Sequence, residues 1–388
     1  MSHLRASALG LLAGAVAGTP DERPIRWGIM GTGTIATDFV NVLKALPGTQ
    51  VAAVGSRNVE RASEFAEALA LDGGTTTLHG SYEALAADDS LDVVYVATPS
   101  LRHVDDSLVC LRHGRAVLCE KSMAPSAREA RRVLNEAAAR QLFFAHAVWS
   151  RFFPVMARLR QTIQSGAIGR VTSAHVSFCQ ADGAGACSAT LETGIYCVQF
   201  LLWVFDDAAP DVRAVVPDLH PGGLDQHVTA VLAFPCGGVG TFECSLIHSS
   251  PREAVICGTK GVIRVPFPFW CPTSFTVQTM DGPASQRFGP LTTIEEPLPD
   301  LGEAKPAGGF NFVHSEGLAY EALEVNRCIR AGLTEPPAFD AEACLRVMGV
   351  IEEVRSHWSH EGEVTGELAG TWAGSAQEPE FGVPPFRP

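Results

Sequence analysis

With 388 residues, the chain is long enough for two domains that each bury a sizeable core. Its 46% hydrophobic and 19% charged residues are typical of a folded globular protein and exclude an intrinsically disordered one. The formal net charge of −14 argues against a nucleic-acid partner, which would require a basic face. No apolar stretch reaches the ~18–20 residues that a helix needs to span a bilayer.

Residues 1–23 are predicted to form an extension ahead of the first domain. An apolar stretch from Ala6 to Gly18 follows His3 and Arg5, without an acidic residue before Asp21. Two interpretations fit this pattern, a disordered extension and a targeting sequence.

The eleven cysteines follow neither the pattern of a disulfide framework nor that of a zinc site. Their number is odd, and no CxxC pair occurs. Five lie inside apolar runs, where a thiol behaves as a small hydrophobic side chain: Cys110, Cys119, Cys197, Cys244 and Cys257. We therefore expect a reducing compartment and a cytoplasmic location.

Strands and helices alternate from residue 24 to residue 148, which predicts a doubly wound α/β domain of the dinucleotide-binding Rossmann type. The predicted strands cover 25–30, 50–55, 91–98, 116–120 and 142–148. The predicted helices cover 34–46, 59–69, 81–87, 103–112 and 127–140.

A glycine turn between the first strand and the first helix is typical of a pyrophosphate site. Gly31 permits the tight turn, Gly33 lets the backbone approach the phosphates, and Ala36 lets the helix pack closely. The N–H groups at the helix start would then face the anion. The residues expected to contact the cofactor here are Gly31, Thr32, Gly33, Thr34 and Ile35. An ordinary strand-to-helix turn is the alternative.

The end of the second strand indicates which nicotinamide cofactor is bound. An acidic residue at this place would bind the ribose hydroxyls of NAD, but the chain has Ser56 and Arg57. A hydroxyl and a guanidinium can hydrogen-bond a 2′-phosphate, which favours NADP. Alternatively, Arg57 is a solvated loop charge that does not discriminate between the two cofactors.

Further polar residues follow the third and fourth predicted long strands. The carboxyl ends of parallel strands line the ligand crevice of a doubly wound sheet, so these residues should face the cofactor. They are Thr98, Pro99, His103, Glu120 and Lys121. Taken alone, a Glu-Lys pair is more often a surface ion pair.

The pattern changes after Trp149, and residues 149–361 are predicted to form an α+β domain with a mostly antiparallel sheet. Its predicted strands cover 171–178, 212–216, 227–234, 240–247 and 253–257. Its predicted helices cover 190–205, 316–331 and 341–358. Residues 362–388 are rich in Gly, Pro and Glu without periodicity, and we expect a tail of low order.

The glycine turn, the Thr98-Pro99-x-x-x-His103 segment and Glu120-Lys121 together resemble the motifs of the Gfo/Idh/MocA oxidoreductases. That family combines a Rossmann domain with a C-terminal open-faced antiparallel sheet. The similarity is strongest to its dimeric dihydrodiol dehydrogenases, which also act as NADP-dependent D-xylose dehydrogenases. It rests on 149–154, 194–200, 258–261 and 270–273, with support from Tyr320-Glu-Ala and 351–355.

The resemblance implies oxidation of a hydroxyl of a cyclic diol or an aldose, with hydride transfer to NADP. It implies Lys121 and Tyr196 as the catalytic pair, and Trp149, Arg151 and Glu192 as substrate contacts. A free tyrosine has a pKa of about 10, so we expect the Lys121 ammonium to lower the pKa of Tyr196. The resemblance also implies a homodimer through the C-terminal sheet.

Four features depart from the family pattern, and the first is Glu192, which stands where relatives carry an aspartate. Ser122 replaces the proline that often follows a cis peptide bond, and we expect a trans bond here because non-proline cis bonds cost ~2.5–4 kcal/mol. His146 stands where close relatives have a glutamate, and the segment Gln180–Thr190 looks shortened. Two alternatives therefore stay open: a catalytically weak dinucleotide-binding sensor or scaffold, and a related sugar or inositol dehydrogenase.

No metal site is expected. His227 and His248 lie on predicted strands, and His357 and His360 lie near a helix end. We predict that no carboxylates converge on these histidines, and hydride transfer of this kind needs no metal.

Overall fold

The computed structural model describes residues 23–181, 187–280, 288–302 and 305–358. The predicted tail and nearly all of the predicted N-terminal extension lie outside the described residues, as does part of the segment Gln180–Thr190. Within the described residues, no helix combines the length and the apolar character needed to cross a membrane.

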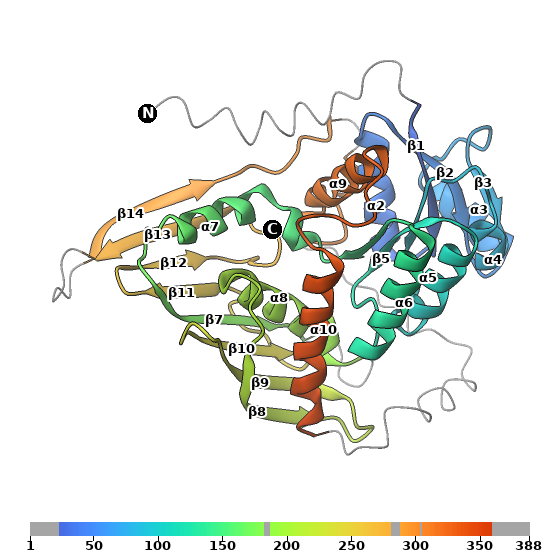
Figure 1. The fold of residues 1–388 in the computed structure, drawn as a ribbon. Helices are drawn as coiled ribbons and strands as arrows, with labels where there is room; N and C mark the ends of the chain where they lie inside the picture. The colour runs from blue at the N-terminus through green and yellow to red at the C-terminus, as the bar shows by residue number, and fades with distance from the viewer. Residues whose placement is uncertain (1–22, 182–186, 281–287, 303–304, 359–388) are drawn as a thin grey trace.

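The N-terminal domain is built around a six-stranded sheet in the order β3-β2-β1-β4-β5-β6 (Figure 1). All of its strand pairs are parallel, which confirms the predicted doubly wound sheet. The strands are β1 (Ile25–Met30), β2 (Thr49–Gly55), β3 (Thr77–His79), β4 (Val93–Val96), β5 (Ala116–Glu120) and β6 (Phe144–Ala147). The helices are α2 (Thr34–Ala45), α3 (Val59–Ala68), α4 (Tyr82–Ala86), α5 (His103–Arg112) and α6 (Ala127–Arg140).

The second sheet has eight strands in the order β14-β13-β12-β11-β7-β10-β9-β8. Its pairs are antiparallel except β7 with β10, which is parallel, so the sheet is mixed but mostly antiparallel as predicted. The strands are β7 (Val171–Cys179), β8 (Asp211–Leu219), β9 (Asp225–Ala233), β10 (Val239–Ser245), β11 (Ala254–Gly258), β12 (Gly261–Val265), β13 (Ser274–Met280) and β14 (Phe288–Glu295). The sequence prediction missed β3, β12, β13 and β14.

Helices cover one face of this sheet (Figure 1). They are α7 (Pro154–Gln164), which the sequence prediction missed, α8 (Ile195–Val204) and α10 (Ala341–Ser356). Every residue of α8 is buried, as expected of a helix that is apolar all round. Side chains of β7, β9 and β10 alternate: Phe242 and Cys244 are buried, whereas Thr241 and Glu243 on the opposite face are half-buried.

The chain returns to the first domain through α9 (Leu318–Arg330), which packs against α2. The Trp27 indole on β1 donates to Asn326 Oδ1 on α9 at 3.0 Å. The fully buried Asp38 carboxylate of α2 accepts four hydrogen bonds from the segment before α9. The donors are Asn311 N at 3.0 Å, Asn311 Nδ2 at 2.7 Å, Phe312 N at 3.0 Å and Ser315 Oγ at 2.6 Å.

Replacing this carboxylate is expected to weaken the connection between the two domains. Asp38→Ala should lower the free energy of unfolding by about 2–4 kcal/mol, because it leaves donors without their acceptor. Denaturant unfolding measures this change. The matched control is Glu64→Ala on the exposed surface of α3, with an expected change within about 0.5 kcal/mol. A loss below about 1 kcal/mol for Asp38→Ala would show that the connection does not depend on this carboxylate.

His146 on β6 is buried, and burial lowers its pKa to about 3. Its neutral ring accepts a hydrogen bond at Nε2 from the Met123 backbone N–H at 3.2 Å. Its Nδ1 lies 3.3 Å from Cys344 Sγ, and its ring lies 5.9 Å from that of Phe339. The position where relatives have a glutamate is therefore occupied here by a neutral core side chain.

This burial predicts a pH dependence of stability. The unfolded chain binds a proton at His146 near the ordinary pKa of 6.5, whereas the folded protein binds it only near pH 3. The contribution of the neutral His146 ring to the free energy of unfolding is thus fully present above pH 6.5. It is lost as the pH falls, by about 2 kcal/mol between pH 7 and pH 5. In urea unfolding, the free energy of unfolding of His146→Gln should lack this dependence on pH. The control His113→Gln, at an exposed histidine, should retain it. Equal slopes in wild type and His146→Gln would contradict the assignment.

Candidate functional site

The glycine turn is built as a cradle for an anion. Gly31 has φ of +105°, and a Cβ there would lie 2.6 Å from the Ala97 carbonyl oxygen, so no other residue fits. A Cβ on Gly33 would point into open space. Helix α2 starts without a side-chain cap and without an acidic residue in its first turn. Its N-terminal N–H groups therefore fit the phosphates of a dinucleotide.

The other predicted cofactor residues follow this turn along one edge of the sheet. Because β2, β1, β4 and β5 are neighbours in the parallel sheet, the residues after each strand are neighbours too. Thr32, Gly33, Thr34 and Ile35 are at least partly exposed, as is Pro99 after β4. Ser56 after β2 is buried, with its hydroxyl oxygen 3.4 Å from that of Thr32. The edge is thus continuous from the end of β2 to the end of β5.

Arg57 is exposed beside Ser56, and two more guanidiniums lie close by. Arg57, Arg61 and Arg102 all act electrostatically on the phenol of Tyr82. The Arg102 guanidinium lies 5.4 Å from the centre of the Tyr82 ring. Arg102 pairs with the buried Asp106 carboxylate at 2.5 Å, so Arg57 and Arg61 supply the positive charge at the end of β2.

His103 and Thr98 hold the loops in place. The buried His103 ring lies between two carbonyl oxygens, that of Thr98 at 2.7 Å from Nε2 and that of Ser122 at 2.8 Å from Nδ1. Burial lowers the pKa of His103, and a neutral ring can donate to only one of them. The Thr98 hydroxyl donates to Asp106 at 2.7 Å. Both side chains are engaged with the protein, so they position the loops after β4 and β5.

Lys121, Glu192 and Tyr196 come together at the end of β5. The Lys121 ammonium donates to the Glu192 carboxylate and lies 5.9 Å from the centre of the Tyr196 ring. Glu192 lies in η3 (Thr190–Gly194), a π-helical turn that leads directly into α8. Trp149, in the short helix η2 (Trp149–Phe152), donates its indole N–H to the Tyr196 hydroxyl oxygen at 3.1 Å. Four of the predicted residues thus form one cluster.

The electrostatics of this cluster differ from the expectation. Burial, with the Glu120 and Glu192 carboxylates, raises the pKa of Tyr196 well above its ordinary value. The prediction that Lys121 lowers this pKa is wrong, because burial and two negative charges outweigh one ammonium. Burial also acts to lower the pKa of Lys121, but Glu192 offsets this and the net pKa is raised. Tyr196 is therefore a neutral phenol and Lys121 a cation.

Glu120 lies behind the cluster. Its carboxylate accepts a hydrogen bond from the Tyr95 hydroxyl at 2.5 Å and another from the Lys121 backbone N–H at 3.1 Å. Burial raises the pKa of Glu120. The sequence prediction missed Tyr95, since a tyrosine in an apolar strand gives no sign of a polar partner in the next strand.

One expectation about the site needs correction, and Arg151 lies deeper in the protein than the sequence indicates. The peptide bond between Lys121 and Ser122 is cis, so the prediction of a trans bond is wrong. Arg151 is enclosed, with a fully buried side chain that donates to Gln199 Oε1 at 2.8 Å and to Asp207 Oδ1 at 2.9 Å. Its guanidinium lies between the rings of Trp203 and Phe339. These contacts hold the Arg151 guanidinium inside the second domain, and its predicted contact with the substrate stays a prediction.

Asp225 was not identified from the sequence. Its buried carboxylate accepts from the Ser188 hydroxyl at 2.6 Å and from the Thr190 backbone N–H at 2.7 Å. Ser122 Oγ donates to the Leu191 carbonyl oxygen at 2.8 Å. These contacts fix the start of η3 and hence Glu192. Only proximity in three dimensions reveals them, because Asp225 lies 35 residues from Thr190.

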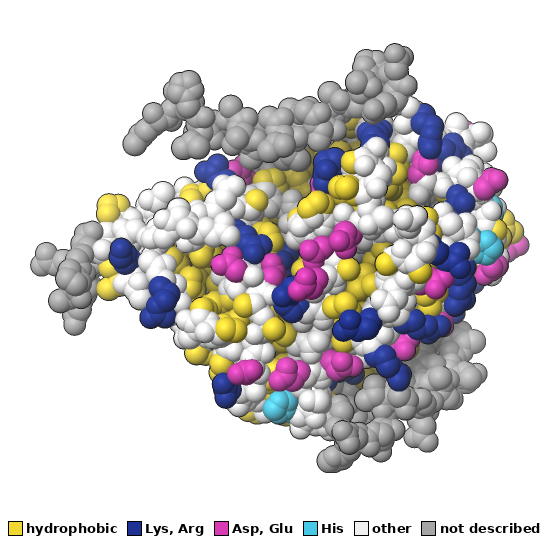
Figure 2. Space-filling model, in the orientation of Figure 1, with side chains coloured by type: hydrophobic (Ala, Val, Ile, Leu, Met, Phe, Trp, Pro, Cys, Tyr) yellow, Lys and Arg dark blue, Asp and Glu magenta, His cyan; other side chains and the backbone are white. Residues whose placement is uncertain are grey.

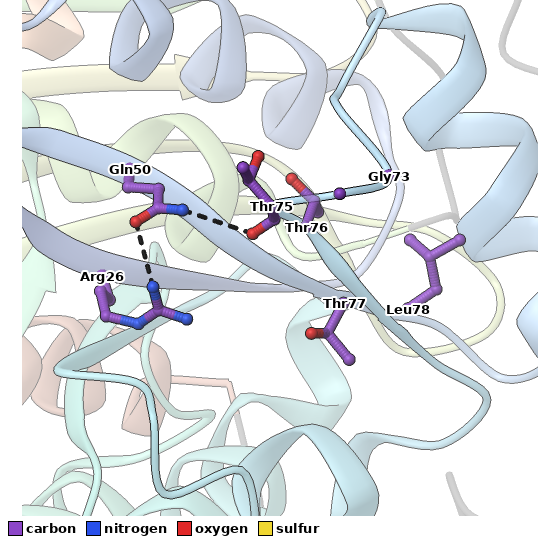
Figure 3. Close-up of a pocket in the computed structure, with 8 residues that line it drawn as sticks. Arg26, Gln50, Gly73, Thr75, Thr76, Thr77 and Leu78 are labelled. Carbon is purple, nitrogen blue, oxygen red and sulfur yellow. Dashed lines mark hydrogen bonds between the residues drawn. The ribbon is translucent and has the colours of Figure 1, made fainter.

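A hollow of about 630 Å³ lies elsewhere, at the amino ends of β1 and β2 (Figure 3). Arg26 donates to Gln50 there at 3.1 Å, and Gln50 donates to the Thr75 carbonyl oxygen at 3.3 Å. Because the glycine turn follows the carboxyl end of β1, this hollow is at the opposite end of the sheet from the candidate site.

The expectation about the histidines also changes. Glu243 lies 3.2 Å from both His227 Nε2 and His248 Nε2, so the prediction that no carboxylate converges on these histidines is wrong. His360 lies outside the described residues.

Comparisons with known proteins agree with this architecture. The sequence model of an oxidoreductase family with an NAD-binding Rossmann fold matches residues 25–147, and that of the GFO/IDH/MocA C-terminal domain matches residues 156–264. The trans-1,2-dihydrobenzene-1,2-diol dehydrogenases of Mus musculus and Homo sapiens are 37% and 36% identical over 341 residues, which is 85% of this chain and 96% of theirs.

Solved structures share the fold at lower identity. KijD10, a 3-ketoreductase from Actinomadura kijaniata in complex with TDP-benzene and NADP, superposes with a TM-score of 0.70 at 22% identity, over 86% of this chain and 98% of that one. A levoglucosan dehydrogenase in complex with NADH and levoglucosan gives a TM-score of 0.71 at 19% identity, over 87% of this chain and 98% of that one. With both domains matched by family models and relatives above one-third identity, the chain belongs to the GFO/IDH/MocA family of oxidoreductases.

Proposed function

We propose that this protein is an NADP-dependent dehydrogenase that oxidises a hydroxyl of a cyclic trans-dihydrodiol or of an aldose such as D-xylose. The observation that carries the proposal is the cluster of Lys121, Glu192 and Tyr196 at the carboxyl end of β5. The cluster lies on the same sheet edge as the glycine turn. The names of the dihydrodiol dehydrogenase relatives support the diol as substrate.

Tyr196 is suited to exchange a proton with the substrate oxygen. Trp149 donates to its hydroxyl oxygen, which leaves the hydroxyl proton available. The raised pKa keeps this proton in place, so Tyr196 acts as a general acid when a carbonyl is reduced. In the oxidising direction Tyr196 must first release its own proton to solvent, and the resulting phenolate, beside the Lys121 ammonium, then accepts the proton from the substrate hydroxyl. A bound nicotinamide supplies the hydride acceptor or donor.

Lys121 provides the positive charge of the site. Its ammonium lies near the Tyr196 ring and would stabilise negative charge on the substrate oxygen as hydride moves. Glu192 holds the ammonium in place and keeps it charged. Glu192 is therefore proposed to position Lys121, in addition to its predicted contact with the substrate.

The basic end of β2 supports NADP over NAD. Ser56 and Arg57 provide a hydroxyl and a guanidinium, with Arg61 nearby, where NAD-specific domains have a carboxylate. A 2′-phosphate gains charge-assisted hydrogen bonds from such groups.

We also propose a homodimer through the C-terminal sheet and a cytoplasmic location. The sheet has one helix-covered face and one face of alternating half-buried side chains, which could receive a second copy. All eleven cysteines are free thiols in the structure, which is consistent with a reducing compartment.

Two measurements separate the proposal from its alternatives. Fluorescence titration with NADPH tests cofactor binding, and the absorbance of reduced nicotinamide then follows turnover over a panel of aldoses, inositols and a trans-dihydrodiol. Binding without turnover on any panel member would favour a sensor or scaffold. Preference for an inositol or for a sugar other than D-xylose would favour a related dehydrogenase.

Removal of the Tyr196 hydroxyl tests the proton-transfer step. Tyr196→Phe should lower kcat by about 10²–10⁴-fold, because the substrate oxygen loses its proton partner. NADPH affinity should change little. The control is Tyr320→Phe, which removes a hydroxyl that donates to the Pro297 carbonyl oxygen at 2.9 Å outside the cluster. Turnover of Tyr196→Phe within about threefold of wild type would exclude this role.

Cofactor preference tests the role of Arg57. Arg57→Ala should lower kcat/KM for NADP by about 10–100-fold, the size of one or two charged hydrogen bonds, and leave kcat/KM for NAD nearly unchanged. Arg128→Ala, at an exposed guanidinium on α6, is the control. A wild-type NADP/NAD ratio of kcat/KM near or below one would rule out the preference.

A further inference from the structure

Four side chains of types that can bind metal ions lie together on the face of the eight-stranded sheet opposite α8. Cys179 ends β7, Glu243 lies in β10, His248 follows β10, and His227 lies in β9. The register pairs Ser245 of β10 with both Cys179 and His227. Since neighbours in register share a face and Glu243 is two residues from Ser245, these side chains lie on one face. Phe178, Phe242 and Cys244 alternate with them and are buried on the α8 side.

The spacing of the ligand atoms suits a small cation. Sγ of Cys179, a carboxylate oxygen of Glu243 and a ring nitrogen of His248 all lie within 4.8 Å of one another. Nε2 of His227 and Nε2 of His248 each lie 3.2 Å from the same oxygen of Glu243. Around a tetrahedral ion with bonds of about 2.0–2.3 Å, neighbouring ligand atoms are about 3.3–3.8 Å apart. Small rotations of these side chains therefore close a coordination shell.

Ser245 gives the site an outer support. Its hydroxyl oxygen lies 3.0 Å from His248 Nδ1, so Nε2 of that ring faces Glu243. Metal-bound imidazoles are held in this way, through the ring nitrogen that does not bind the metal. The Ile247 backbone N–H donates to the same hydroxyl at 3.1 Å, which fixes the support in turn.

The ligand types select the metal. A thiolate, an imidazole and a carboxylate are ligands of Zn²⁺ and similar divalent transition ions, whereas Mg²⁺ and Ca²⁺ prefer oxygen ligands alone. Loss of the Cys179 thiol proton on binding gives two negative charges, which balance a divalent ion. Cys179 is buried, but the side chains of Glu243 and His248 are 38% and 42% exposed in the single chain, so an ion can enter from solvent before a second copy covers this face.

We propose that Cys179, Glu243 and His248 bind a divalent transition-metal ion of the Zn²⁺ class, with His227 as a fourth ligand or as an outer partner of Glu243. The ion links the ends of β7 and β10 and, through His227, β9. The site lies on the sheet face opposite the helix that carries Tyr196, so it stabilises the second sheet and takes no part in hydride transfer.

Co²⁺ and Zn²⁺ titration of the full chain tests the site after removal of metal with a chelator. We expect one equivalent of Co²⁺ with a thiolate-to-cobalt charge-transfer band, displaced by Zn²⁺, and a higher melting temperature with Zn²⁺. Cys179→Ser should abolish the band, and His248→Ala should weaken affinity at least about 100-fold. Ser245→Ala should weaken it by about 10–100-fold, since it removes only the support.

Matched controls keep the interpretation specific. His175→Ala removes an exposed imidazole from the same strand as Cys179, and Cys236→Ser removes an exposed thiol elsewhere. Both should bind Co²⁺ like wild type, and circular dichroism confirms the fold of each variant. Because His248 is exposed, His248→Ala tests the site even if Cys179→Ser does not fold. Absence of a thiolate band in wild type, or unchanged affinity in His248→Ala, would overturn the proposal.

Discussion

The buried carboxylate of Asp38 connects the helix that follows the glycine turn with the segment that leads into α9. Four donors surround it, so a charge that would be costly to bury alone is satisfied by a distant part of the chain. This connection keeps the start of α2 and the second domain in one fixed relation. A glycine turn alone binds phosphates, but only the joined domains place Lys121 of the first next to Glu192 and Tyr196 of the second.

The candidate site depends on the balance of buried charges. Glu120 and Glu192 place negative charge beside Tyr196, and the Lys121 ammonium is held by Glu192. A phenol in this field keeps its proton, which suits a group that gives a proton to a carbonyl oxygen and takes it back from a hydroxyl. Outside this cluster, charges of both signs are interspersed on the face seen in Figure 2, without a large patch of one sign.

The eight-stranded sheet separates two kinds of chemistry. Its inner face packs against α8, which carries Tyr196 toward the end of β5. Its outer face brings Cys179, Glu243 and two histidines together through strand register. Alternation along β7 and β10 therefore places neighbouring residues in two unrelated environments, a closed apolar core and a half-exposed polar cluster.

The sequence by itself determined the order of the helices and of all strands but β3 in the first domain, because these strands are apolar and β-branched and the turns contain glycine. It also predicted Gly31, Lys121 and Tyr196 as site residues, since motif and position carry that information. The sequence prediction missed short or polar strands such as β3 and β14, because pairing with a neighbouring strand stabilises them more than their own composition does. Only the tertiary structure revealed the burial of Arg151, the neutral Tyr196 and the convergence of Glu243 with His227 and His248. Each of these depends on the charges and distances between residues far apart in the chain, which no local pattern records.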